Sequence, residues 1–397
     1  MAEQSHHPQA RRSFLALAGA GLLSIALAGC QVVPRRPAPP PPPEPTGPVR
    51  PPISPNLPRD ETRNRVAVLV PLSGANAGVG QSIANAANLA LLDTGGERIR
   101  ITVYDTAKGG ALAAANEALA DGNGLFLGPL LAEDARAIAP VARGRGVPVI
   151  AFSNDSSVAG NGVYLMGFTP RQSITRTVSF AAERGVQRFA ALTPQGVYGR
   201  RASQAMIDAV EQAGGRMVAM QELGRTPAAM RAAVATLNGQ GAYDAVLIAD
   251  SGKSAATVAA LVRSGPSGRA RILGTELWST EAGLAALPAL RGAWFASASD
   301  TMFNQFKTRY RARYGKTPYR LASLGYDAVL LSVRVAADWR IGWPFPERAL
   351  LDPGGFAGVD GAFRFRPNGV AERALQVQEI GPAGLTVVSP APRGFSN

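Results

Sequence analysis

Side chains capable of covalent or acid–base chemistry are scarce in this sequence of 397 residues. Cys30 is its one cysteine, and its two histidines, His6 and His7, both precede that cysteine. Catalytic triads, Cys–His pairs and His-based zinc sites all require an imidazole. If the segment before Cys30 is removed, as argued below, the mature chain has none. None of the four lysines has a serine three residues before it, so the Ser-x-x-Lys signature of β-lactamases and transpeptidases is missing. We therefore expect a non-enzymatic protein without a metal site or cofactor; the paired carboxylates of a hydrolase are the one enzymatic alternative left open.

Cys30 stands at the end of a segment that has the features of an export signal. Arg11 and Arg12 precede the apolar stretch 14–28, which is too short for a comfortable membrane span. Leu27-Ala28-Gly29-Cys30 resembles the lipobox of bacterial lipoproteins, in which the cysteine is acylated and becomes the new N-terminus. The resemblance implies removal of residues 1–30, histidines included, and a lipid anchor at Cys30. An ordinary signal followed by a free or buried cysteine is the alternative.

The export route and the target membrane follow from the residues around this signal. Arg11-Arg12-Ser13-Phe14-Leu15 resembles a twin-arginine signal, and a plain basic region is the alternative. Gln31, rather than an aspartate, follows the cysteine. By analogy with lipoprotein sorting, this favours a periplasmic protein anchored to the outer membrane over one anchored to the inner membrane. The proline-rich segment 31–62 predicts an extended tether between the anchor and the folded part.

The charge pattern argues against a nucleic-acid partner although the formal net charge is +13. The arginines are scattered, lysines number four, and an exported lipoprotein rarely meets nucleic acid. Attraction to anionic lipids or wall polymers remains open. Nucleotide motifs also fail: Leu247 stands where a phosphate-binding loop ending in Gly252-Lys253-Ser254 needs a glycine.

The hydropathy pattern predicts two doubly wound α/β lobes with a ligand cleft between them. Apolar runs typical of buried parallel strands, such as 66–70, 99–104 and 147–152, alternate with helical patterns such as 79–92 and 132–143. The alternation restarts after Pro170, and strands at 361–365 and 374–380 flank a hairpin signal. The predicted boundaries give residues 63–169 plus 299–350 to the first lobe and 170–298 plus 351–397 to the second.

Several segments in order carry a resemblance to a known family. Val66 to Gly74, Gly146 to Ile150, Tyr198-Gly199 and Tyr314 to Pro318 resemble type I periplasmic binding proteins of the leucine/isoleucine/valine class. Leu127-Gly128-Pro129-Leu130-Leu131, together with the lipobox and tether, is similar to the penicillin-binding-protein activator lipoproteins, which use this fold to regulate peptidoglycan synthesis. The first resemblance implies a solute-binding protein of an ABC transporter, with an amino acid-like small molecule as ligand. The second implies a peptidoglycan synthase as partner.

Candidate ligand-binding residues lie in loops that follow the carboxyl ends of the predicted strands, where open α/β sheets bind ligands. They are Ser73, Gly128, Ser153 and Asn154 in the first lobe, and Tyr198, Asp250 and Glu276 in the second. The family resemblance implies that Tyr198 closes over the ligand, with Asp250 nearby, and that Glu276 holds its ammonium group. Leu130 and Leu131 stand where the family commonly offers hydroxyls for a carboxylate. Ordinary turn and capping chemistry is the alternative for each loop residue.

Overall fold

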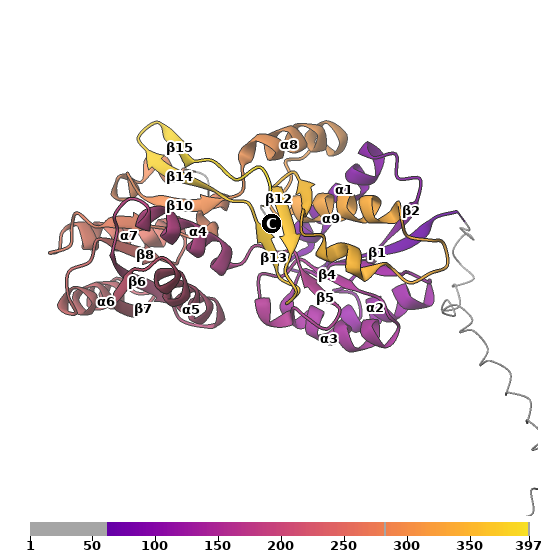
Figure 1. Ribbon diagram of the computed structural model, residues 1–397, viewed down its shortest axis with the longest axis horizontal. Coiled ribbons are helices and arrows are strands. Elements are labelled where there is room, and N and C mark those ends of the chain that lie inside the picture. The colour runs from indigo at the N-terminus through magenta and orange to yellow at the C-terminus, as the bar shows by residue number, and fades with distance from the viewer. Residues whose placement is uncertain (1–61, 282, 396–397) are drawn as a thin grey trace, which may run out of the picture. The chain divides into compact units, whose positions relative to one another are not determined.

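The structure, a computed structural model, describes residues 62–281 and 283–395, which form two α/β lobes (Figure 1). Cys30, the signal segment 1–30 and the tether before Thr62 lie outside the described residues. Within the described part of the chain, every helix is too short or too polar to cross a membrane.

The first lobe is built on a five-stranded sheet in the order β2-β1-β3-β4-β5, in which all neighbouring strands are parallel. Its elements are β1 (Asn64–Val70), α1 (Ala77–Asp93), β2 (Ile99–Asp105), α2 (Ala111–Ala120), β3 (Leu125–Leu127), α3 (Ala132–Gly144), β4 (Val149–Ala151), β5 (Val163–Leu165), α8 (Asp300–Tyr314) and α9 (Ala322–Ala336). Val66 and Val68 pack against α1 and α9 on one face, and Ala67 and Leu69 pack against α2 and α3 on the other. Because both faces are covered, β1 is apolar throughout rather than alternating.

The second lobe repeats this plan on a seven-stranded sheet in the order β15-β14-β10-β9-β8-β6-β7. Its elements are α4 (Pro170–Ala182), β6 (Arg188–Pro194), α5 (Val197–Gln212), β7 (Arg216–Leu223), α6 (Pro227–Gly239), β8 (Ala245–Ile248), α7 (Gly252–Arg263), β9 (Arg271–Leu273), β10 (Trp294–Ser297), β14 (Gln376–Gly381) and β15 (Gly384–Ser389). The strands β6 to β10 are parallel, and β14 and β15 extend the sheet antiparallel at one edge. The predicted doubly wound, two-lobed fold is confirmed.

A small third sheet corrects two details of the sequence-based prediction. It contains β11 (Phe356–Gly358), β12 (Gly361–Phe365) and β13 (Ala371–Arg373), all antiparallel. Its aromatic side chains pack in the core of the first lobe, although the prediction places all of 351–397 in the second. The predicted hairpin also pairs differently: β12 pairs with the short β13, whereas 376–381 forms β14 in the other sheet, beside β10.

The chain passes between the lobes three times, after β5, after β10 and after β13. The third passage is short, because Ala371 still packs in the core of the first lobe and Leu375 already packs in that of the second. These passages bring the loops at the strand ends of both lobes to one cleft.

Candidate functional site

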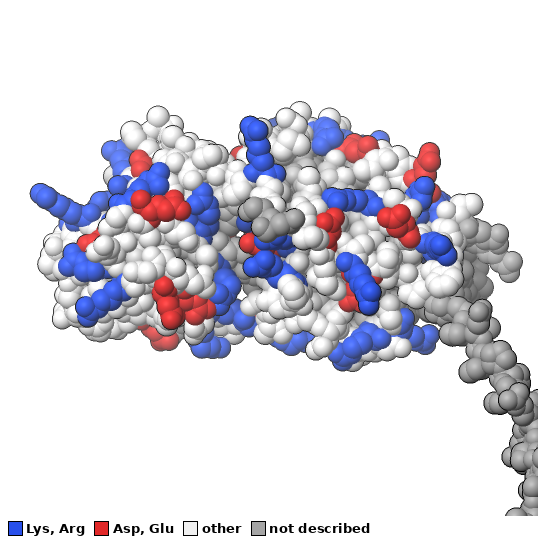
Figure 2. Space-filling model, viewed as in Figure 1, with Lys and Arg blue, Asp and Glu red and all other residues white. Residues whose placement is uncertain are grey.

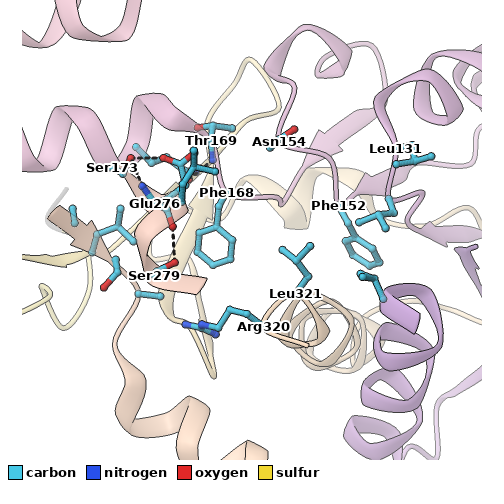
Figure 3. A pocket seen from close by; sticks show the side chains of 18 of the residues that line it. Leu131, Phe152, Asn154, Phe168, Thr169, Ser173, Glu276, Ser279, Arg320 and Leu321 are labelled. Carbon is cyan, nitrogen blue, oxygen red and sulfur yellow. Dashed lines mark hydrogen bonds between the residues drawn. The ribbon is translucent and has the colours of Figure 1, made fainter. Parts of the chain in front are cut away.

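A cavity of about 380 Å³ lies between the lobes, within the size range of small-molecule sites. The first lobe and the passages contribute mainly apolar side chains: Val79, Leu130, Leu131, Phe152, Phe168 and Leu321. The second lobe contributes polar groups, above all Ser173 and Glu276. Figure 3 shows the two sets facing each other, with Phe168 and Leu321 between them.

Glu276 is the acidic group of the cavity. It follows β9 and opens a short 3₁₀ helix, Glu276–Thr280. Its Oε2 accepts a hydrogen bond from the Ser173 hydroxyl at 2.6 Å, and its Oε1 lies 3.0 Å from the Tyr198 hydroxyl. The Tyr198 hydroxyl also lies 3.0 Å from Oγ1 of the buried Thr275. Ser173 and Tyr198 therefore orient the carboxylate from the second lobe.

The electrostatic surroundings of Glu276 leave its charge without a counter-ion. Burial raises the pKa of Glu276, and the hydrogen bonds from Ser173 and Tyr198 oppose that rise only in part. Burial and the charge of Glu276 raise the pKa of Tyr198, so its hydroxyl remains a donor. Among the described residues, no lysine or arginine forms an ion pair with Glu276. A partly buried carboxylate in this state favours a cation beside it.

The basic residue that lines the cavity among the described residues, Arg320, is already neutralised. It forms an ion pair with the fully buried Asp360, and its guanidinium lies 3.9 Å from the centre of the Phe303 ring. The side chain of Arg320 is 13% exposed. The guanidinium of Arg320 therefore stabilises the interior of the first lobe, and its charge is compensated without a ligand.

Leu130 and Leu131 line the cavity where the family resemblance leads one to expect hydroxyls. Gly128, two residues before Leu130, has φ +102°, a backbone conformation that favours glycine. A Cβ at Gly128 would lie 2.1 Å from the carbonyl oxygen of Leu69 on the neighbouring strand. Gly128 thus serves close packing of the backbone rather than the cavity surface.

The other predicted site residues divide between the cavity and local structure. Asn154 lines the cavity, together with Glu276. Tyr198, which the resemblance places over the ligand, is not part of the lining; its hydroxyl contacts Glu276 and Thr275 instead. Three others are also outside the lining and are held by neighbours: Ser73 donates to Asp105 at 2.8 Å, Ser153 accepts from the backbone N–H of Asp155 at 3.0 Å, and Asp250 accepts from that of Ser251 at 2.7 Å.

An ion pair joins the lobes beside the cavity. Asp155, next to Asn154 in the first lobe, pairs with Arg201 of α5 in the second lobe and with Arg136 of α3. Arg201 also donates to the Ser156 hydroxyl at 2.9 Å. Burial alone would raise the pKa of Asp155, but hydrogen bonds from Ser157 and Arg136 and the charge of Arg201 lower it. This contact is an interlobe latch, and we use that name for the Asp155–Arg201 pair.

Sequence reasoning missed Ser173, Arg320 and Arg201. Ser173 lies in the first turn of α4, which begins directly after the first passage between the lobes. The Thr169-Pro170 helix start was the available signal, because it marks a helix N-terminus where the chain enters the second lobe. Arg201 lies in α5 only three residues after Tyr198, but its partner is 46 positions earlier in the sequence.

No group of three or more His, Cys, Asp or Glu side chains with the geometry of a metal site occurs in the described residues.

A model of the periplasmic binding protein family matches residues 64–384. The chain belongs to this family. The match includes the five-stranded sheet, the strands β6 to β14 and the three passages, as well as the residues that line the cavity between the lobes, so the predicted resemblance is confirmed. Family membership suggests the periplasm as the location.

Known proteins show the same relationship at low sequence identity. An uncharacterized protein of Rickettsia prowazekii (strain Madrid E) is 27% identical over 149 residues, which are 37% of this chain and 40% of that protein. The chain thus matches less than half of that curated relative. A branched-chain amino acid ABC transporter periplasmic ligand-binding protein of Burkholderia xenovorans LB400 superposes with a TM-score of 0.66 at 17% identity, covering 83% of this chain and 96% of that one.

The second class of structural neighbour is a regulator. The C-domain of LpoA from Haemophilus influenzae, a regulator of PBP1A, superposes with a TM-score of 0.65 at 20% identity, covering 82% of this chain and all of that one. At such identities the structural matches establish the fold alone. These two neighbours are a binding protein and a regulator rather than enzymes.

Proposed function

We propose that the protein is a non-enzymatic solute-binding protein of the ABC-transporter type whose cleft holds a small molecule with a protonated amine and an apolar body. Apolar amino acids belong to this class. The observation that carries the proposal is the carboxylate of Glu276, which lines the cavity without a cationic partner among the described residues. A ligand ammonium would supply the missing charge.

The opposite wall defines the other half of the ligand. Leu130, Leu131 and Phe152 present apolar surface, and burying about 100 Å² of it would contribute roughly 2.5 kcal/mol. The same wall lacks the hydroxyls that would receive a carboxylate. The ligand's amine and apolar body therefore contribute more to affinity in this proposal than any carboxylate.

Three ligands that differ by one group test the proposal. L-Leucine has an amine, a carboxylate and an apolar body; 3-methylbutylamine lacks the carboxylate, and 4-methylpentanoate lacks the amine. In calorimetry of the full-length protein we expect both amines to bind and 4-methylpentanoate to bind at least tenfold more weakly or not at all. Binding of 4-methylpentanoate alone, or of none of these ligands and no other amine, would refute the proposal.

A second candidate function is regulation of a peptidoglycan synthase by direct contact. The match to the whole C-domain of LpoA supports it. Crosslinking in cells followed by purification should then recover a synthase, and a deletion strain should show altered wall synthesis. Recovery of transporter subunits instead, with normal wall synthesis, would favour the solute-binding function.

We also propose that a lipid anchor at Cys30 attaches the protein to the periplasmic face of a membrane, the outer one in preference to the inner. The Leu27-Ala28-Gly29-Cys30 sequence supports this. Labelling of cells with a radioactive fatty acid should mark the wild-type protein and leave Cys30→Ala unlabelled. Equal labelling of both would contradict an anchor at Cys30.

A further inference from the structure

A second hollow, of about 570 Å³, lies beside the cleft and is rich in arginine. Its walls come from both lobes: α4 and the end of α5 on one side, and β12 and β13 on the other, with residues 392–395 at the rim. We call it the arginine groove; its basic residues are Arg171, Arg176, Arg364, Arg366 and Arg373. Figure 2 shows basic side chains on both sides of the junction between α4 and the β12–β13 strands.

Acidic partners in the groove are too few for these arginines. Glu372 is the one acidic side chain in its described lining, and it is shared by Arg364 at 2.8 Å and Arg366 at 3.5 Å. Arg171 pairs with Asp208 of α5. Arg176 instead donates to the carbonyl oxygen of Leu375 at 3.0 Å and to the Ser389 hydroxyl at 2.6 Å. The groove therefore carries an excess of positive charge.

Arg373 supplies a second, independent observation. It is 6% exposed, and its Nη2 donates to the carbonyl oxygen of Met166 at 2.7 Å. Its Nε and Nη1 are buried and have no hydrogen-bond partner among the described residues. A buried N–H without an acceptor is costly, and the carboxylates of Asp360 and Asp327 in the first lobe offset part of the charge of Arg373.

We propose that the arginine groove is a second binding site, for a small multivalent oxyanion such as a phosphate ester or a polycarboxylate. The planar guanidinium matches phosphate and carboxylate oxygens with two parallel hydrogen bonds. Because the arginines stand on walls from both lobes, an anion with two or more charged groups can contact both walls at once. This site is separate from the amine site and does not use Glu276.

The groove is placed so that its occupant affects the cleft. Thr169, Gln172 and Leu375 line both hollows. The Arg373 guanidinium lies 4.4 Å from the centre of the Phe168 ring, which lines the cleft. An anion bridging the walls fixes the relative position of the lobes, and by reciprocity a cleft ligand changes the affinity of the anion.

Calorimetry of the full-length protein with pyrophosphate and with citrate at low ionic strength tests the site. We expect binding that weakens as salt is added, that falls about tenfold in Arg171→Gln, and that falls further when Arg366→Gln is added. Both side chains are 55% exposed, so these variants should fold. Arg188→Gln is the matched control, since Arg188 is 51% exposed and pairs with Asp244, and neither residue lines the groove.

Two further arms decide the place and the source of the anion. Glu276→Gln should retain pyrophosphate binding; its loss would place the anion in the cleft and overturn the proposal. Absence of binding in the wild type, or equal weakening by Arg188→Gln, would also overturn it. Flotation with phosphatidylglycerol vesicles separates the sources: vesicle binding that needs Arg171 and is displaced by pyrophosphate supports a lipid headgroup, and pyrophosphate binding without vesicle binding supports a soluble anion.

Discussion

Asp155 is buried beside the cleft and Glu276 is partly buried in its lining, and their surroundings are opposite. Asp155 of the first lobe is held by two arginines, one from each lobe, and its pKa is lowered. Glu276 of the second lobe receives hydrogen bonds from two neutral hydroxyls, and burial raises its pKa. The first charge is compensated within the protein, and the second is not.

This difference separates a structural acid from one available to a ligand. Breaking a compensated ion pair leaves an arginine without its partner, so Asp155 should matter for stability and for the contact between the lobes. Removing the charge of Glu276 relieves a desolvation cost in the empty protein, so Glu276→Gln should weaken ligand binding without destabilising the fold.

The largest expected effect is on ligand binding by Glu276→Gln. The substitution keeps the shape and removes the charge that would pair with the ligand amine, so affinity for the amine should fall at least about 30-fold, equivalent to roughly 2 kcal/mol or more. Calorimetry with L-leucine and 3-methylbutylamine measures it. Urea unfolding is the companion measurement, and a variant both weaker in binding and clearly less stable would contradict the distinction drawn above.

Asp155→Asn should reverse that pattern. It breaks the interlobe latch and leaves Arg201 without its acid, so unfolding should become easier by about 1–3 kcal/mol. Arg136 adds little because its side chain is 52% exposed. Asp208→Asn is the control, since it breaks a more exposed pair with Arg171 and should cost at most about 1 kcal/mol. Equal losses in the two variants would remove the special role of the latch.

Tyr198→Phe should have a smaller effect in the cleft. It removes one of the two hydroxyls that orient Glu276 and leaves the carboxylate charge in place. Affinity for the amine should fall about 3- to 10-fold, the contribution of a single hydrogen bond. Calorimetry under the conditions used for Glu276→Gln compares the loss of amine affinity in the two variants. A larger loss in Tyr198→Phe than in Glu276→Gln would mean that Tyr198 contacts the ligand directly.

The pH dependence of stability should differ in sign between the two acids. Glu276, with a raised pKa, stabilises the fold at low pH and loses that contribution as pH rises above its ordinary value near 4.5. Asp155, with a lowered pKa, stabilises the fold above its ordinary value near 3.8 and loses that contribution as pH falls through its lowered value. Urea unfolding from pH 3 to 7 should thus show Glu276→Gln gaining on the wild type as pH rises, and Asp155→Asn approaching it as pH falls.

Local hydropathy patterns predicted most of the fold because the apolar or alternating character of a strand depends on which of its faces are buried. The run 66–70 predicted a strand covered on both faces, and β1 is covered by helices on both. The pattern could not choose between pairing partners. Residues 374–380 look like the second half of a hairpin with 361–365, but β14 lies between β15, which follows it, and β10, about 80 positions earlier in the chain. Pairing over such a distance depends on the packing of the whole lobe.

The site was predictable where a residue type and a strand end coincide. Glu276 follows β9 directly, and Asn154 follows β4 closely; both line the cavity. The same rule selected Ser73, which donates to Asp105 at the end of β2, and Asp250, which accepts within its own loop. The sequence contains no local sign of whether a polar loop residue turns inward or caps its neighbours, and no sign that Arg201 reaches Asp155 in the other lobe.

A crystal structure of the full-length protein with the tightest-binding amine would show directly whether Glu276 binds the amine of the ligand. The amine nitrogen should lie within about 3.2 Å of a Glu276 carboxylate oxygen, with the apolar body against Leu130, Leu131 and Phe152. An amine nitrogen held by any other group, with Glu276 bonded only to Ser173 and Tyr198, would contradict it.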